Sequence, residues 1–200
     1  MVDSSMKRTA KWLCVAAFAA LFAAPRPVHA QIPELGLKGG ANLAVLGGKD
    51  AGAMERRTGF AFGAFLTVPN GSGRSLQAEA LLTQKGARYG GASDSFLYLE
   101  APVLYRISPV LPPAVPVKPV LYAGPTAGLL LRARMGDADA KHLYRSTDFG
   151  IALGGAVEFT RITLDARYQF GLTSIVKTIG QITPDYKHRV FSVFLGYKLF

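Results

Sequence analysis

The sequence predicts an all-β protein, an eight-stranded antiparallel up-and-down transmembrane β-barrel. Three observations lead to this fold class. Eight segments of about 9 to 13 residues alternate apolar and polar side chains, and this length suits a tilted strand that crosses a bilayer. The connections between the segments alternate between long and short. The chain also begins with a segment typical of an export signal.

Residues 1–30 have the parts of a cleaved signal peptide. The basic stretch KRTAK precedes the apolar run WLCVAAFAALFAA, and the triplet VHA ends the segment before Gln31. The apolar run includes Cys14, the only cysteine of the chain. We therefore predict a signal peptide at 1–30 and an outer-membrane barrel domain at 31–200. That domain lacks cysteine, which excludes disulfides, thiol catalysis and cysteine-based metal sites.

The first four predicted strands each carry one apolar face. In the fourth, the odd positions from Leu97 to Tyr105 are apolar or aromatic, whereas the even positions include Glu100 and Arg106. A period of two predicts a strand rather than a helix. The four segments are Leu35–Leu46, Thr58–Val68, Ser75–Ala87 and Phe96–Arg106.

The other four strands follow the same pattern. Glycines alternate with apolar residues in the fifth and sixth, where they leave room for bulky neighbours across a narrow lumen. The seventh opposes Leu164 and Tyr168 to Asp165 and Arg167, and the last ends the chain with VFSVFLGYKLF. The four segments are Pro119–Leu131, Thr147–Glu158, Ile162–Phe170 and Phe191–Leu199.

The connections predict which end of the barrel faces outward. Strands one, three, five and seven are followed by GGKDAGAMERR, RYGGASDS, RARMGDADAKHLYRS and the stretch 174–188, whereas PNGSGR and FTR follow strands two and six. Short periplasmic turns and longer outer loops are typical of such barrels, so we expect both termini in the periplasm. The four prolines of SPVLPPAVPVK predict a stiff, extended turn after strand four.

The chain is basic, with 23 basic and 13 acidic side chains, of which 19 and 12 lie after residue 30. An exported protein does not meet nucleic acid, so we expect no nucleic-acid partner and take outer-membrane lipids as the counter-charge. The basic outer loops favour contact with the phosphates of lipopolysaccharide. Charge that only maintains solubility explains them equally well.

A membrane location requires a closed barrel, because no window after Ala30 has about 18 consecutive apolar residues. A soluble secreted ligand-binding barrel, with its apolar face inside, is the alternative. Aromatic residues at the ends of the apolar faces are typical of interface girdles and favour the membrane. These residues are Phe60, Tyr105, Phe149, Phe170 and Tyr197.

Six motifs in order resemble the outer-membrane β-barrel family that includes PorT-like proteins: GLKGGAN, LQAEALLTQKGARYG, YLEAPVLYR, KPVLYAGPTAGLLL, DFGIALGGAVEF and LDARYQFGL. The resemblance covers nearly the whole chain after residue 30. It implies the fold, the bacterial outer membrane as location, and recognition of the C-terminal strand by the assembly machinery. Members tend to end in Tyr-Lys-Phe, whereas this chain ends in Tyr197-Lys198-Leu199-Phe200. The resemblance implies little about activity.

The polar face predicts a structural network in the lumen. The interior of an eight-stranded barrel is just wide enough for side chains to fill, so charges there neutralise one another rather than catalyse. We expect Glu79, Glu100, Asp165 and Arg167 at its centre. The predicted members of this network are Lys38, Glu79, Glu100, Arg106, Asp165 and Arg167.

Catalysis is not expected. His142 and His188 are the only histidines after residue 30, both are predicted in outer loops, and neither has a nucleophilic serine in a recognisable pattern. We expect no catalytic residue, no cofactor and no metal centre. The predicted function is non-enzymatic: envelope structure, surface interaction or an accessory part of an envelope or secretion assembly. A small passive pore is the alternative.

Overall fold

The computed structural model describes residues 32–47, 55–71, 73–89, 92–109, 111–112, 116–136, 138–174 and 187–200. The chain divides into two units, Met1–Ala30 and Gln31–Phe200. The predicted signal peptide lies outside the described residues. The described residues all belong to the second unit.

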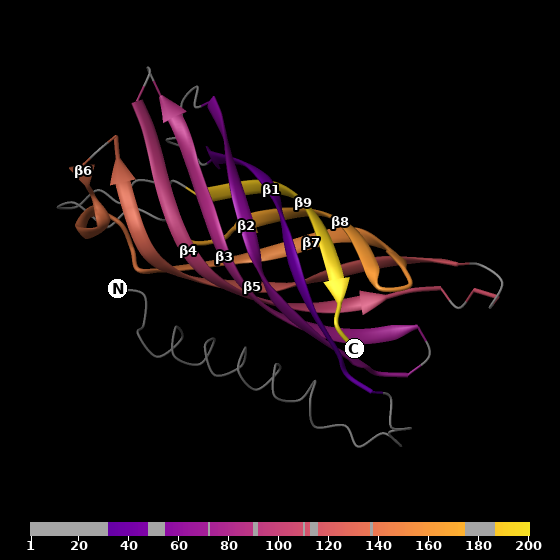
Figure 1. Cartoon of the computed structure of the whole chain (residues 1–200). Helices are drawn as coiled ribbons and strands as arrows, with labels where there is room; N and C mark the ends of the chain where they lie inside the picture. Colours follow the sequence, from indigo (N-terminus) through magenta and orange to yellow (C-terminus); the bar gives the residue numbers. More distant parts are fainter. Residues whose placement is uncertain are drawn as a thin grey trace, which may run out of the picture. The chain divides into compact units, whose positions relative to one another are not determined.

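This unit is a sheet of antiparallel strands (Figure 1). The strands are β1 (Glu34–Gly47), β2 (Glu55–Pro69), β3 (Arg74–Tyr89), β4 (Ala92–Ile107), β5 (Val117–Met135), β6 (Ala138–Asp139), β7 (Thr147–Phe159), β8 (Ile162–Gly171) and β9 (Lys187–Lys198), with a short 3-10 helix η1 (Lys141–Leu143). The two-residue β6 pairs only with β5.

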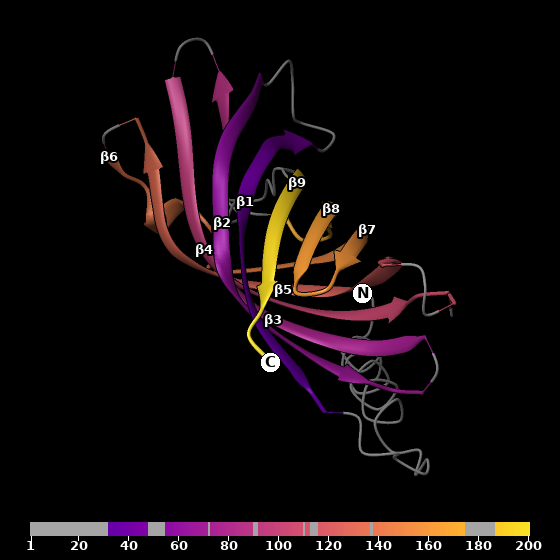
Figure 2. The ribbon, with the colours of Figure 1, turned by 45° about the vertical axis from the view of Figure 1, so that its right-hand side comes forward.

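The other eight strands close on themselves. Each pairs with its neighbour along the chain, β4 pairs with β5, and β9 pairs with both β8 and β1. Figure 2 shows β9 between β1 and β8. Closure gives each of these eight strands a hydrogen-bonded partner on both sides, as a bilayer requires. The predicted eight-stranded antiparallel barrel is confirmed.

The outward face is apolar. Leu121, Leu164 and Leu195 are 72%, 56% and 61% exposed, whereas their chain neighbours Tyr122, Asp165 and Phe194 are buried inside the barrel. The band ends towards the longer connections at polar or charged outward positions on different strands, among them Gln84, Ser95, Arg132 and Arg189. A soluble barrel has its apolar face inside and its polar face in water. The outward apolar side chains of this barrel therefore suit contact with lipid.

Strands β3, β4 and β5 extend farther than the sequence predicts, and Figure 1 shows them running past β7 and β8 at the end that carries β6. The predicted outer loop RYGGASDS is wrong: β3 continues to Tyr89 and pairs with Ala92 at the start of β4. Beyond the bilayer both faces of a strand meet water, so apolar alternation is not needed there. Its absence made this part of the hairpin resemble a loop.

Glycines allow close approaches at specific points. A Cβ on Gly40 would lie 1.9 Å from the backbone oxygen of Val193, and one on Gly154 would lie 2.5 Å from the hydroxyl of Tyr122. In the turn after β2, Gly71 and Gly73 have φ angles of 87° and 71°, which favour glycine. Gly154 therefore makes room for a bulky lumen side chain, as the sequence predicts.

Candidate functional site

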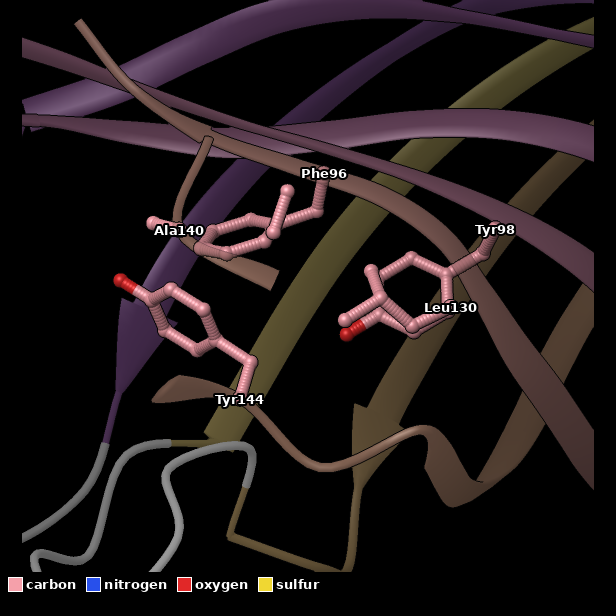
Figure 3. Packing of buried hydrophobic residues seen from close by; sticks show 6 residues of the cluster. Phe96, Tyr98, Leu130, Ala140 and Tyr144 are labelled. Atoms are coloured by element: carbon pink, nitrogen blue, oxygen red, sulfur yellow. The ribbon is translucent and has the colours of Figure 1, made fainter. Parts of the chain in front are cut away.

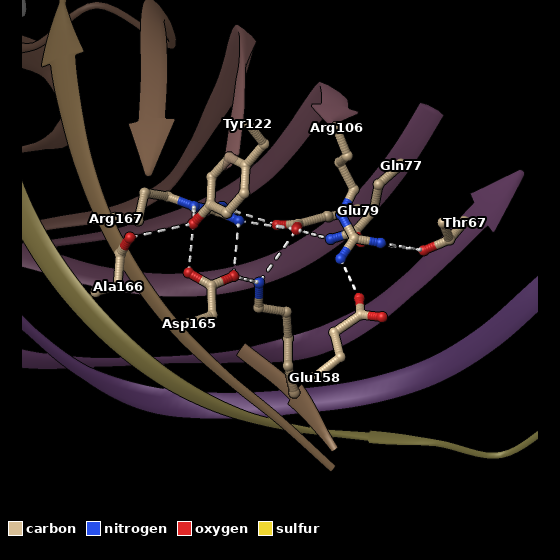
Figure 4. A network of polar contacts seen from close by, with 10 residues as sticks. Thr67, Gln77, Glu79, Arg106, Tyr122, Glu158, Asp165, Ala166 and Arg167 are labelled. Carbon is tan, nitrogen blue, oxygen red and sulfur yellow. Dashed lines mark hydrogen bonds and ion pairs between the residues drawn. The ribbon is translucent and has the colours of Figure 1, made fainter. Parts of the chain in front are cut away.

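The middle of the lumen holds a buried network of four charged side chains, Lys38, Glu79, Asp165 and Arg167 (Figure 4). Arg167 binds Glu79 through two parallel hydrogen bonds, Nη1 to Oε2 and Nη2 to Oε1, each 2.8 Å long. Lys38 Nζ lies 3.1 Å from Glu79 Oε1 and 2.8 Å from Asp165 Oδ2. Two cations and two carboxylates alternate in this network, which we call the middle network. It is electrically balanced.

Neutral side chains complete the middle network. The Tyr122 hydroxyl donates to Asp165, and the Gln77 amide donates to Glu79. The guanidinium of Arg167 also lies 5.2 Å and 5.3 Å from the ring centres of Tyr122 and Phe194. Buried charges are stable only when they are paired and hydrogen-bonded, and these contacts supply both conditions.

A second cluster lies at the mouth with the short turns. Arg106 binds Glu158, and Lys198 Nζ lies 2.8 Å from carboxylate oxygens of both Glu158 and Glu34. The Nη1 of Arg106 also donates to the Thr67 hydroxyl over 3.4 Å. Arg106 therefore lies beside the middle network and outside its four-charge centre (Figure 4).

A third cluster lies nearer the outer end. Lys85 Nζ is 2.6 Å from Glu100 Oε1 and 3.7 Å from Asp148 Oδ2, and the Gln169 amide donates to Glu100 over 2.9 Å. The expectation that Glu100 shares the centre with Glu79 is therefore wrong. In the register of β3 and β4, Glu100 lies opposite Leu81. Leu81 is the next inward residue after Glu79 on β3, towards the outer end of the barrel.

An apolar layer lies between these two polar levels. Ala61, Leu81 and Phe194 are 1%, 1% and 2% exposed and pack as one cluster. On β3 it places Leu81 between the levels of Glu79 and Glu100, whereas on β8 the polar side chain of Gln169 directly follows Arg167 at the next inward position.

Aromatic side chains pack together next to the third cluster (Figure 3), and Lys85 Nζ lies 5.2 Å from the ring centre of Tyr98. Phe96 and Tyr144 meet edge to face with ring centres 4.7 Å apart, and Tyr144 follows η1 in the β5–β7 connection. This aromatic cap consists of Phe96, Tyr98, Leu130, Ala133, Ala140 and Tyr144.

The predicted outer-loop location of His188 is wrong. It lies on β9 with 1% exposure, and its ring is 5.5 Å from those of Phe96 and Tyr98. His188 has the same parity as the inward Val190 and Ser192, a signal that was present in the sequence. His142 lies in η1, in the connection where the sequence places it.

Tyr122 and Asp148 are further lumen residues, absent from the set that the sequence predicts. Both have the inward parity of their strands, but Tyr122 has apolar neighbours and Asp148 begins a glycine-rich segment. Parity alone would have found them.

The lumen leaves little free volume at the level of the middle network. A cavity of about 10 Å³ lies among residues that include Lys38, Gln77, Tyr122 and Asp165. That is room for about one water molecule. At the described residues no group of three or more His, Cys, Asp or Glu side chains is placed to hold a metal ion. Within the same residues, no helix has the length and apolar composition for a membrane crossing.

A family model described as outer membrane protein beta-barrel domain matches residues 30–177. Among solved structures, Neisserial surface protein A (NspA) superimposes with a TM-score of 0.53 and 15% identity, over 84% of this chain and 100% of that chain. At this identity the likeness shows the fold alone. The matched family residues include β1 to β8, and β9 completes the barrel beyond them.

Two further barrels are less similar. The attachment invasion locus protein Ail of Yersinia pestis has a TM-score of 0.47 and 13% identity, over 84% of this chain and 100% of that chain. The outer membrane enzyme PagL has a TM-score of 0.48 and 15% identity, over 80% of this chain and 98% of that chain. Neither likeness bears on activity. No curated protein sequence matches the chain.

Proposed function

Because the chain belongs to the outer membrane protein beta-barrel domain family, and is a small β-barrel protein of the bacterial outer membrane, we propose that it works there as a closed, non-enzymatic barrel. Its role is structural or adhesive: it holds the outer β5–β7 connection at the cell surface and contacts outer-membrane lipids. The fold does not by itself select this role, since barrels of one architecture serve several functions.

The observation that best supports this proposal is that side chains fill the lumen in successive layers. From the short-turn mouth outward, charged pairs, an apolar layer, a second polar cluster and an aromatic cap follow one another. Both oxygens of Glu79 are held by Arg167, and Asp165 is held by Lys38 and Tyr122. Carboxylates committed to ion pairs are poor candidates for acid–base catalysis, and a filled lumen does not favour the pore alternative.

Thiol accessibility tests this proposal. Ser192 and Ser75 both point inward, but Ser192 is 5% exposed within the filled lumen, whereas Ser75 lines the open mouth. Serine to cysteine is nearly isosteric, so Ser192→Cys and Ser75→Cys form a matched pair. A hydrophilic thiol reagent should label the cysteine at 75 and spare the one at 192. Rapid labelling at both positions would indicate a water-filled lumen and support the passive pore.

The outward arginines support contact with lipopolysaccharide. Arg132 and Arg134 on β5 and Arg189 on β9 are exposed and lie where the apolar band ends towards the outer loops. Guanidinium groups at that level are placed to bind phosphates by charge-assisted hydrogen bonds. Replacing all three with glutamine should reduce lipopolysaccharide co-purified with the barrel. Arg161→Gln, an exposed arginine in the turn at the other end, is the control. Equal retention by both variants would count against this contact.

The finer resemblance to PorT-like proteins, and with it an accessory role in a secretion assembly, stays a prediction. Pull-down from detergent-solubilised outer membranes would test it. A stable protein partner recovered with the wild type and absent after removal of the barrel would favour the accessory role over a purely structural one.

A further inference from the structure

The mouth at the short-turn end contains a cavity that the filled lumen does not explain. Its volume is about 200 Å³, compared with about 10 Å³ at the level of the middle network. Its walls come from the ends of β1 to β5 and the turn after β2. By the usual orientation of such barrels this mouth opens to the periplasm.

The charged side chains that line this cavity are mostly cations. Arg74, Arg106 and Lys118 are present against a single carboxylate, Glu34. That carboxylate is already bound by Lys198, with 2.8 Å between Nζ and Oε2. Arg106 is likewise paired, with Glu158. The cavity wall therefore keeps the positive charges of Arg74 and Lys118.

Arg106 is held in place at the bottom of the cavity. It is 5% exposed, its Nη2 binds Glu158, and its Nη1 donates to Thr67 over 3.4 Å. A guanidinium has five N–H donors, so this fixation still leaves donors for a ligand. An arginine whose position is fixed in advance loses less conformational entropy on binding than a free one.

Lys118 differs from the other inward cations of the mouth. It lies opposite Glu158 in the register of β5 and β7, but Arg106 and Lys198 occupy that carboxylate. Among the described residues no carboxylate lies within ion-pairing distance of Lys118. Lys118 lines the cavity, is exposed, and has no counter-charge in this part of the chain.

The free donors around the cavity come from different strands: Arg74 and Ser75 from β3, Arg106 from β4 and Lys118 from β5. The hydroxyls of Thr67 and Ser108 also line it, but they already donate to Gln77 Oε1 over 3.0 Å and to the Pro109 carbonyl over 3.3 Å. Donors that converge from several directions suit a tetrahedral oxyanion better than a planar carboxylate, which takes two parallel hydrogen bonds. The cavity is also larger than one inorganic phosphate, so an organic substituent fits with it.

We infer that this mouth is a binding site for a phosphate group carried by a small organic molecule or a lipid, with Arg106 and Lys118 as its main contacts. Arg74 contributes charge at the rim. The site lies at the opposite end of the barrel from the outer arginines and needs neither an open lumen nor an enzymatic step.

The test uses the full barrel in phosphatidylcholine nanodiscs, titrated with glycerol 3-phosphate by calorimetry. Wild type should bind, and the Arg74→Ala/Lys118→Ala variant should lose affinity by about tenfold or more, because each removed cation takes a charge-assisted hydrogen bond with it. Arg161→Ala removes an arginine at the same end that does not line the cavity, and should bind like wild type. A second arm replaces part of the lipid with phosphatidylglycerol.

Binding in the first arm that the double variant loses supports a soluble phosphate ester as the ligand. If only the nanodiscs that contain phosphatidylglycerol stabilise the barrel, and the double variant loses this stabilisation, the phosphate belongs to a lipid headgroup. Absence of binding in both arms, or equal binding by the double variant and Arg161→Ala, overturns the site. Unchanged heat-resistant migration of each variant in detergent gels shows that the barrel itself has folded.

Discussion

Arg167→Met removes the cation that holds the middle network together. Arg167 is 2% exposed and makes two 2.8 Å hydrogen bonds to Glu79. Without it, Lys38 alone faces two buried carboxylates, at 3.1 Å and 2.8 Å. Removing one partner of a buried pair costs about 3 to 5 kcal/mol. Because Lys38 remains, we expect the lower part of that range, about 3 kcal/mol.

Urea unfolding of the barrel in detergent, followed by the loss of heat-resistant gel migration, measures this cost. Arg161→Met, an exposed arginine, is the matched control and should change stability little. The double variant Arg167→Met/Glu79→Gln leaves one cation and one carboxylate, Lys38 and Asp165, and should recover part of the loss. A single variant as stable as wild type, or a double variant less stable than the single one, would refute the account of the network.

Three other substitutions test the faces and the orientation of the barrel. Leu164→Arg places a cation on the lipid face, at a side chain 56% exposed, and should impair membrane insertion at a cost of about 2 to 4 kcal/mol; normal insertion would contradict the assignment of that face. Gly40→Ala brings a Cβ within 1.9 Å of a backbone oxygen and should lower the yield of folded barrel, whereas Gly39→Ala meets nothing within 3.7 Å and should not; equal yields would count against the packing. An impermeant thiol reagent on intact cells should label Ala138→Cys and not Arg161→Cys, and the reverse pattern would invert the barrel.

The alternation of apolar and polar side chains predicts the strands, which side of each strand faces the lipid, and most of the lumen residues. This two-residue period depends only on two things: strand geometry, which points successive side chains to opposite faces, and the contrast between an apolar lipid surface and a polar lumen. It could not predict how inward residues divide into layers, because that depends on the register between strands. Glu100 and Glu79 are both inward, yet the pairing of Leu81 with Glu100 places them on different levels.

The ends of the strands were harder to predict. Beyond the bilayer, β3 and β4 lose the apolar alternation, so RYGGASDS resembled a loop although it is mostly paired strand. The sequence predicts a loop at His188 for the same reason, because this residue lies at the outer end of β9, close to where the alternating pattern fades. The mouth cavity depends on five strand ends meeting in space, which no single segment of the sequence reveals.

Ion conductance tests the closed-barrel account most directly. Purified wild-type protein inserted into planar lipid bilayers should give no steady current, because the middle network, the apolar layer and the aromatic cap fill successive levels of the lumen. Insertion is verified separately by protease protection of the reconstituted barrel. Steady channels from the pure protein, with a conductance that rises with salt concentration, would contradict the account and favour a passive pore.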